Sequence, residues 1–197
     1  MKKIITISRE FGGGGRTIGK RLAEELGVPC YDSEIIEKVA IESGFAEEYI
    51  KDKGEYTYPS LLMGLLMSRS LYAGPTNEDK IWLIQCKIIK ELAEKGPCVI
   101  VGRCADYILR ERDDVMKVFI HADIKARAKR IVEVYGETDE DPVKRLRDKD
   151  KRRAAYYTQY TDIVWGASRN YDVCLDSSVI GIDKCVSVLK EIALETE

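Results

Sequence analysis

Apolar residues follow two spacings along the chain, and their alternation predicts an α/β fold. Runs such as 4–7 and 98–102 are apolar at nearly every position, as strands buried on both faces of a parallel sheet are. Between the runs, apolar residues recur three or four positions apart, for example at Ile18, Leu22 and Leu26, which is the spacing of one helix face. We expect five strands, at residues 4–7, 28–31, 98–102, 114–121 and 171–176.

The helices expected between these strands have recognisable starts and stops. Asp123 stands where an N-cap would, and Gly96-Pro97 ends the longest periodic stretch. Strands that alternate with helices imply a doubly wound parallel sheet, and a chain of 197 residues suits a single domain, 1–197. The expected helices cover residues 16–26, 34–43, 77–95 and 181–194, with one more after Asp123.

Composition and charge narrow the class of protein. With 45% hydrophobic residues, 34% charged residues and a net charge of −2, the chain has no bias toward nucleic acid polymers or membranes. The first apolar run is too short for a signal peptide and no run reaches the roughly 20 residues that span a bilayer, so we expect a cytoplasmic protein. Six cysteines form no C-x-x-C pair, and the one histidine, His121, ends an apolar strand, so we expect neither a zinc site nor a disulfide.

Four consecutive glycines, Gly12, Gly13, Gly14 and Gly15, separate the first strand from the first helix. Glycine permits backbone angles in which successive N–H groups turn toward one anion, and the first helical turn adds unpaired donors and the positive end of the helix dipole. A glycine cluster can also serve only to reverse the chain. The first loop of an α/β chain, directly before a helix, is however where phosphate-binding loops lie, and we interpret the four glycines in this way.

Residues 14–20 also fit the Walker A spacing G-x-x-x-x-G-K. Lys20 follows Ile18 by two positions and therefore points to the opposite side of the helix from the apolar face. We interpret this second match as accidental.

The stretch I-S-R-E-F-G-G-G-G-R-T-I-G-K-R-L-A, at residues 7–23, resembles the opening of the cytidylate kinase-like family of P-loop proteins. In cytidylate kinase the loop ends Gly-Lys-Gly-Thr, and superposing strand and helix puts Gly15 at the lysine and Thr17 at the threonine. The lysine is therefore missing, and Arg16 is the residue that would stand in for it. The resemblance implies a three-layer P-loop kinase fold with a five-stranded parallel sheet in the order 2-3-1-4-5, a helical arm and a lid.

The same resemblance implies two substrates, with ATP on the glycine loop and Mg²⁺ on Thr17. Tyr-Asp-Ser at 31–33 is similar to the Leu-Asp-Ser that borders the monophosphate site, so Asp32 and Ser33 would contact the acceptor, although both also suit a helix N-cap. Val-Ile-Val-Gly-Arg at 99–103 is similar to the Asp-Gly-Arg segment, whose arginine holds the acceptor phosphate, and this role falls on Arg103.

Val101 stands where the family has an acidic residue near this strand end. Such a carboxylate often helps to hold Mg²⁺, so Asp32, Asp106 or water would have to serve beside Thr17.

Thirteen of the residues from 137 to 153 are charged. Such a run can be a solvated helix face with ion pairs, but Arg-Asp-Lys-Asp-Lys-Arg-Arg-Ala at 147–154 is similar to the lid motif of cytidylate kinase. The resemblance implies a lid at 137–158, in which Asp150 and Arg153 would meet the acceptor. The arginines that would neutralise the transferring phosphoryl group, besides Arg16, are Arg127 or Arg130 together with Arg147 or Arg152.

Residues 44–76 have the weakest pattern. By resemblance they form the arm that folds over the acceptor, but their Leu- and Met-rich part would also suit a packing surface, so a monomer and a homodimer both remain open.

The leading hypothesis is a kinase that moves the γ-phosphoryl group of ATP to a nucleoside monophosphate, with CMP or dCMP first. The alternatives are a kinase of another small phosphate acceptor and a nucleotide-binding protein without catalysis.

Overall fold

Five parallel strands form one sheet in the described part of the chain, a computed structural model that covers residues 3–32, 35, 38, 41, 42, 44, 77–136 and 141–195. The sheet order is β2-β3-β1-β4-β5, which confirms the order implied by the family resemblance. Every neighbouring pair is parallel. The strands are β1 Ile4–Arg9, β2 Cys30–Tyr31, β3 Cys98–Val101, β4 Val115–His121 and β5 Val173–Asp176.

Most of the helices begin and end within one or two residues of the positions expected from the sequence. Two short helices, α6 and α9, were not expected, because four residues are too few to show a helical period. The helix expected at 34–43 lies largely outside the described residues. The helices are α1 Gly15–Leu26, α5 Asn77–Glu94, α6 Ala105–Ile108, α7 Ile124–Glu133, α8 Pro142–Thr161, α9 Ser177–Ile180 and α10 Ile182–Glu195, with a 3-10 turn at Ser168–Asn170.

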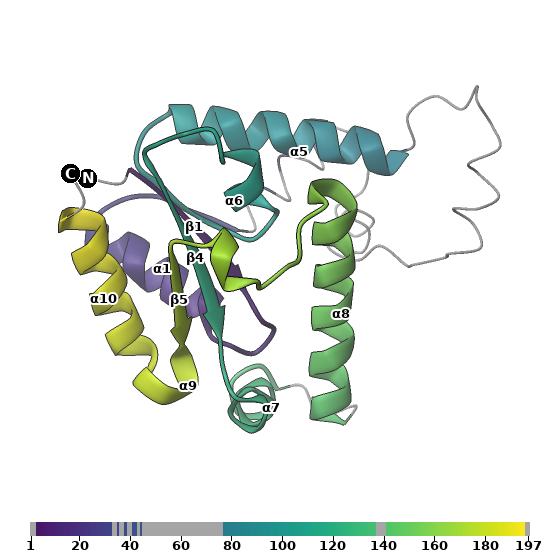
Figure 1. Ribbon diagram of the computed structural model, residues 1–197, viewed down its shortest axis with the longest axis vertical. Helices are drawn as coiled ribbons and strands as arrows, with labels where there is room; N and C mark the ends of the chain where they lie inside the picture. The colour runs from purple at the N-terminus through teal and green to yellow at the C-terminus, as the bar shows by residue number, and fades with distance from the viewer. Residues whose placement is uncertain are drawn as a thin grey trace.

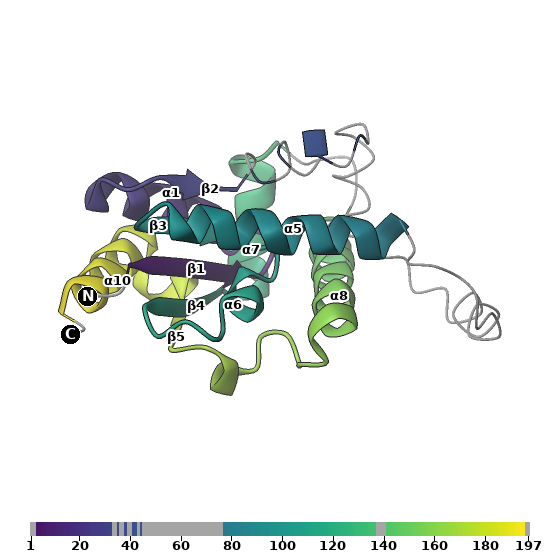
Figure 2. The same ribbon diagram turned by 90° about the horizontal axis from the view of Figure 1, so that it is seen from above.

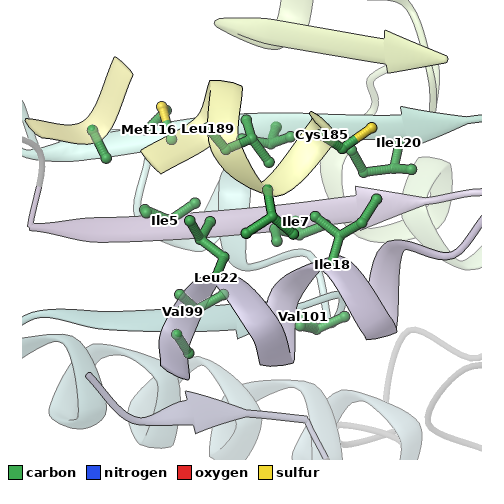
Figure 3. Close-up of a cluster of buried hydrophobic side chains, with 14 residues drawn as sticks. Ile5, Ile7, Ile18, Leu22, Val99, Val101, Met116, Ile120, Cys185 and Leu189 are labelled. Atoms are coloured by element: carbon green, nitrogen blue, oxygen red, sulfur yellow. The ribbon is translucent and has the colours of Figure 1, made fainter. Parts of the chain in front are cut away.

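The sheet is covered on both faces, which makes three layers (Figure 1). Helices α5 and α6 pack on the face that carries Ile4 and Ile100, whereas α1 and α10 pack on the other. Figure 3 shows this second layer, with Ile5 and Ile7 of β1 beneath the helices. Successive side chains of a strand point to opposite faces, so coverage of both faces explains why β1 is apolar at consecutive positions.

Helices α7 and α8 lie together at one end of the sheet, beyond the point where β1 ends (Figure 2). Because the strands are parallel, the loops that follow β1, β3 and β4 all reach this end, which is where open α/β sheets bind ligands. Among the described residues, no helix has both the length and the apolar character needed to cross a membrane.

Candidate active site

The glycine loop leads from β1 directly into α1. Gly14 is the residue before the helix, with a left-handed φ of 79°, and α1 begins at Gly15, one residue from the expected start. A hydroxyl that follows the edge strand β5 holds the loop in place. Ser177 Oγ, at the start of α9, donates to the Gly13 carbonyl (2.6 Å). The loop is therefore held in place at its centre while its helix end carries Thr17.

One face of α8 lies along the segment that joins β1 to the glycines. Leu146, Asp150, Arg153 and Tyr157 recur at helical spacing and form this face. The Phe11 N–H donates to Asp150 Oδ1 (2.7 Å), and Arg153 Nη1 donates to the Arg9 carbonyl (3.2 Å). From residue 142 on, the charged run lies in α8, and its inward residues fix the approach to the loop.

Arg127 of α7 completes this anchor. It is buried, and its Nη1 donates both to Asp150 Oδ2 (2.5 Å) and to the Phe11 carbonyl (3.2 Å). Its Nε lies 3.4 Å from Glu10 Oε2, and Glu10 in turn accepts from the Ala122 N–H (3.1 Å). Arg127 and Asp150 therefore have protein partners in this structure, and the phosphoryl and acceptor roles assigned to them stay predictions.

Arg130, one turn further along α7, lies against the loop itself. Its Nη2 donates to Thr17 Oγ1 (3.0 Å), and its guanidinium carbon is 3.6 Å from the place where a Cβ on Gly14 would stand. Its Nε is buried and has no hydrogen-bond partner among the described residues. The structure thus brings to the loop a cation with an unused donor, which suits a bound phosphate.

The Thr17 hydroxyl suits the role of a single protein ligand of Mg²⁺. Among the described residues, no group of three His, Cys, Asp or Glu side chains is placed to hold a metal ion. Mg²⁺ in kinases usually keeps several waters and phosphate oxygens and takes only one or two protein ligands, so a single hydroxyl at the start of α1 is a sufficient donor set. A hydroxyl has two lone pairs, and the bond from Arg130 uses one.

Arg16 is directed to the neighbouring strand. Its Nε lies 2.5 Å from Asp32 Oδ2, and its side chain is 55% exposed whereas that of Asp32 is 15% exposed. This pair joins the start of α1 to the end of β2 and holds Arg16 on the β2 side of the loop. Ser33, which was assigned to the acceptor site with Asp32, lies outside the described residues.

Arg103 follows β3 in a tight left-handed turn. Gly102, Arg103 and Cys104 have φ values of 79°, 60° and 54°, and the Ala105 N–H donates back to the Gly102 carbonyl (3.2 Å). Gln85 Nε2 of α5 donates to the Arg103 carbonyl (3.0 Å). Arg103 is only 6% exposed, yet no carboxylate in the described part of the chain pairs with its guanidinium. A buried cation without a counter-ion is costly unless a ligand supplies the anion.

A buried carboxyl group lies behind the site. Asp106 of α6 is 3% exposed and accepts from Tyr157 Oη of α8 (2.6 Å) and from Ser8 Oγ of β1 (3.3 Å). Burial raises the pKa of Asp106, and the hydrogen bonds from Tyr157 and Ser8 oppose this only in part. Burial also raises the pKa of Tyr157. The hydrogen-bonding role of Asp106 is therefore structural here.

The other predicted lid arginines lie off the inward face of α8. Arg147 is exposed and directly follows the buried Leu146, about 100° further around the helix. Arg152 is half-buried, one position before Arg153. The structure therefore gathers the glycines, Thr17 and Arg130 with the anchor residues, sets Asp32 and Arg103 beside them, and leaves Arg147 apart.

Sequence reasoning did not single out Arg9, Glu10 or Ser177. Arg9 and Glu10 did leave a signal, since two charged residues follow directly on a buried strand and precede the glycines. Ser177 left none, because its bond to the loop joins residues 164 positions apart.

Comparisons with known proteins bear on the family and the fold. A family model described as the cytidylate kinase-like family matches residues 4–179. A cytidylate kinase from Methanopyrus kandleri is 26% identical over 95% of this chain and 91% of its own length. A crystal structure of an uncharacterized protein from Eubacterium ventriosum has 28% identity and a TM-score of 0.74, with 98% of this chain and 99% of that chain covered.

A more distant likeness concerns the fold alone. A shikimate kinase from Bacteroides thetaiotaomicron has 17% identity and a TM-score of 0.55, with 98% of both chains covered. Such kinases share the layered sheet while their acceptors differ, so the scaffold does not define the acceptor.

Proposed function

Because the chain belongs to the cytidylate kinase-like family, we propose that it transfers the γ-phosphoryl group of ATP to a nucleoside monophosphate, with CMP or dCMP as the first acceptors to test. Family membership by itself supports a phosphotransferase that acts on a nucleotide or another small molecule. The narrower proposal, a nucleoside monophosphate as acceptor, depends on whether the site has groups that can bind a second phosphate.

The observation that carries it is the buried guanidinium of Arg103. It lies in the turn after β3, and the glycine loop follows β1, the strand that pairs with β3. Neighbouring strands are about 4.8 Å apart, so the glycine loop and the turn that carries Arg103 lie side by side beyond the carboxyl ends of these strands. The glycine loop would bind one phosphate through its backbone N–H groups and Arg130, and Arg103, which has no carboxylate partner among the described residues, would bind the other. Two adjacent phosphate sites suit a phosphate donor and a phosphate acceptor.

The reaction asks little covalent work of the protein. An oxygen of the acceptor phosphate forms a bond to the γ-phosphorus, the bond from that phosphorus to the β–γ bridging oxygen breaks, and ADP leaves with the electron pair. A phosphate monoester has a second pKa of about 6 and is mostly a dianion at neutral pH, so no general base is needed. The loop N–H groups and the arginines would hold both phosphates in line and stabilise the spreading charge. Bound Mg²⁺, with Thr17 as its protein ligand, would neutralise charge between the β- and γ-phosphates.

The first experiment is ADP release from ATP and Mg²⁺, with a panel of nucleoside monophosphates and a control without acceptor. We expect CMP or dCMP to give the largest response. Turnover with another small phosphate ester instead would move the proposal to that acceptor. ATP binding without any turnover would favour a nucleotide-binding protein that does not catalyse.

Arg103→Ala tests the acceptor site within the same assay. We expect the KM for the monophosphate to rise at least tenfold, with a much smaller change in the binding of ATP, because a charge-assisted contact to phosphate contributes about 1.5–3 kcal/mol. Arg110→Ala is the matched control, since Arg110 is exposed on the same segment and lies over the Tyr107 ring. An equal loss of ATP and monophosphate binding would contradict the assignment.

A further inference from the structure

The side chain of Arg9 runs through a space that two glycines leave open. A Cβ on Gly15 would lie 2.5 Å from Arg9 Cβ and 2.9 Å from Arg9 Cγ. A Cβ on Gly102 would lie 2.8 Å from Arg9 Cζ and still closer to Nη1. The stem of Arg9 therefore passes against the first residue of α1, and its guanidinium lies against the residue that precedes Arg103.

Gly15 is the position where the family resemblance places the missing lysine. Since Arg9 Cβ and Cγ occupy the space of any side chain at residue 15, a lysine there and an arginine at position 9 exclude each other in this conformation. The absence of a lysine at position 15 and the presence of an arginine at position 9 are therefore linked.

We propose that Arg9 supplies the phosphate-binding cation that P-loop kinases take from the lysine, and that it delivers this cation from the strand side of the loop. This inference rests on the proposed phosphoryl transfer. It replaces Arg16 as the residue that stands in for the lysine, because Arg16 is paired with Asp32 and more than half exposed.

The place of the guanidinium defines its task. The stem of Arg9 lies beside Gly15, which belongs to the donor loop, and its guanidinium lies beside Gly102, which adjoins the acceptor arginine. A group that moves from donor to acceptor passes between these two, so Arg9 would contact the transferring phosphoryl group and donate hydrogen bonds to its oxygens without exchanging a proton. Its backbone is fixed for this, since β1 pairs with β3 and β4 and the Arg9 carbonyl accepts from Arg153 Nη1 (3.2 Å).

Arg130 plays a separate part. It approaches the loop from α7 and donates to Thr17 Oγ1, on the helix side of the glycines. Arg9 and Arg130 therefore reach the loop from two different elements, and neither can replace the other without a change in backbone position.

Moving the cation from position 9 to position 15 tests the proposal, with kcat as the measured quantity. We expect Arg9→Met, which keeps the stem and loses the charge, to lower kcat by about 100-fold, the scale observed for loss of one preorganised donor. Arg9→Lys should retain more activity than Arg9→Met. Gly15→Lys alone should be impaired by the clash, whereas Arg9→Gly combined with Gly15→Lys should regain at least tenfold in kcat over Arg9→Gly. If Arg9→Met keeps kcat within about twofold of wild type, or the double variant stays as slow as Arg9→Gly, the proposal is wrong.

Two measurements decide the matter even if no acceptor is turned over. The first is steric: Gly15→Ala should lower the melting temperature by several degrees when Arg9 is present and have little effect when Arg9 is Gly, because the crowding needs both side chains. The second is the rise in melting temperature caused by ATP and Mg²⁺, which should shrink in Arg9→Met. An unchanged rise would overturn the phosphate-binding role, while a wild type that is stabilised by ATP but inactive with every acceptor would count against the proposed function alone.

Discussion

Arg103 keeps a backbone conformation that is unfavourable for any residue with a Cβ. Its φ of 60° and the φ of 54° at Cys104 both lie in the left-handed region, where a residue with a side chain is less stable by about 1–2 kcal/mol. Strain of this kind persists where surrounding contacts impose it, and it is common at ligand sites. Here the turn carries the buried arginine that is proposed to hold the acceptor phosphate, so the proposal sets stability against function at one residue.

Replacement of Arg103 by two small residues separates the strain from the charge. Arg103→Gly and Arg103→Ala both remove the guanidinium, but only glycine relieves the left-handed turn. We expect Arg103→Gly to be more stable than Arg103→Ala by about 1 kcal/mol, and both to lose affinity for the monophosphate to the same extent. Urea unfolding and acceptor titration measure the two effects. Equal stability of the two variants would show that the turn is not strained.

Helix α8 acts as a clamp on the approach to the glycines. Its inward face holds the backbone of Phe11 through Asp150, and Asp150 is also the partner of the buried Arg127. Removal of this carboxylate would leave the Phe11 N–H unsatisfied and would leave Arg127 with only Glu10 and the Phe11 carbonyl as partners. The segment that supplied the predicted lid is therefore, in this structure, part of the support of the loop.

Asp150→Ala should lower the free energy of unfolding by about 2–3 kcal/mol, since it removes the nearer of the two carboxylates that pair with the buried Arg127 and leaves the Phe11 N–H unsatisfied. Asp148→Ala is the matched control, because Asp148 is exposed two positions earlier on α8, and it should change stability by less than about 0.5 kcal/mol. Chemical denaturation of both variants provides the comparison. Similar losses would mean that helix propensity, and not the clamp, governs this part of α8.

The elements that sequence reasoning located are those in which a single pattern repeats. Strands β1, β3 and β4 are largely apolar runs, and α1, α5 and α10 carry apolar residues at helical spacing, so each could be predicted. The place of Arg103, just beyond the end of β3, could be predicted for the same reason. The pairing of Arg127 with Asp150 could not, since it joins two helices and depends on how α7 packs on α8. The path of Arg9 could not be predicted either. Its side chain occupies the space that is left open because Gly15 and Gly102 have no side chains.

At the scale of the whole molecule, Asp106 ties three elements together. Its carboxyl group joins Ser8 of β1 to Tyr157 of α8 from its own place on α6, where water has almost no access. A carboxyl group whose pKa is raised by burial binds its proton more tightly in the folded chain than in the unfolded one. Stability contributed by neutral Asp106 is therefore fully present below the unfolded pKa of about 4 and is lost as the pH rises toward the folded value.

This linkage predicts a pH dependence that Asp106→Asn should remove. We expect the free energy of unfolding of the wild type to fall relative to that of the variant as the pH rises above about 4, with a slope of at most about 1.4 kcal/mol per pH unit. Urea unfolding of both proteins across this range measures the difference. Asp148→Asn, at an exposed position, should run parallel to the wild type. A constant gap between wild type and Asp106→Asn would contradict the raised pKa.

The bonds that hold the glycine loop also set the order in which the protein can be completed during synthesis. The loop leaves the ribosome well before its partners, since Asp150 and Ser177 follow Phe11 and Gly13 by 139 and 164 positions. At about 5–20 residues per second, the loop waits on the order of ten seconds for them. A nascent chain that lacks residue 177 should therefore bind nucleotide poorly, and the loop, although made before its partners, takes its final form only after them.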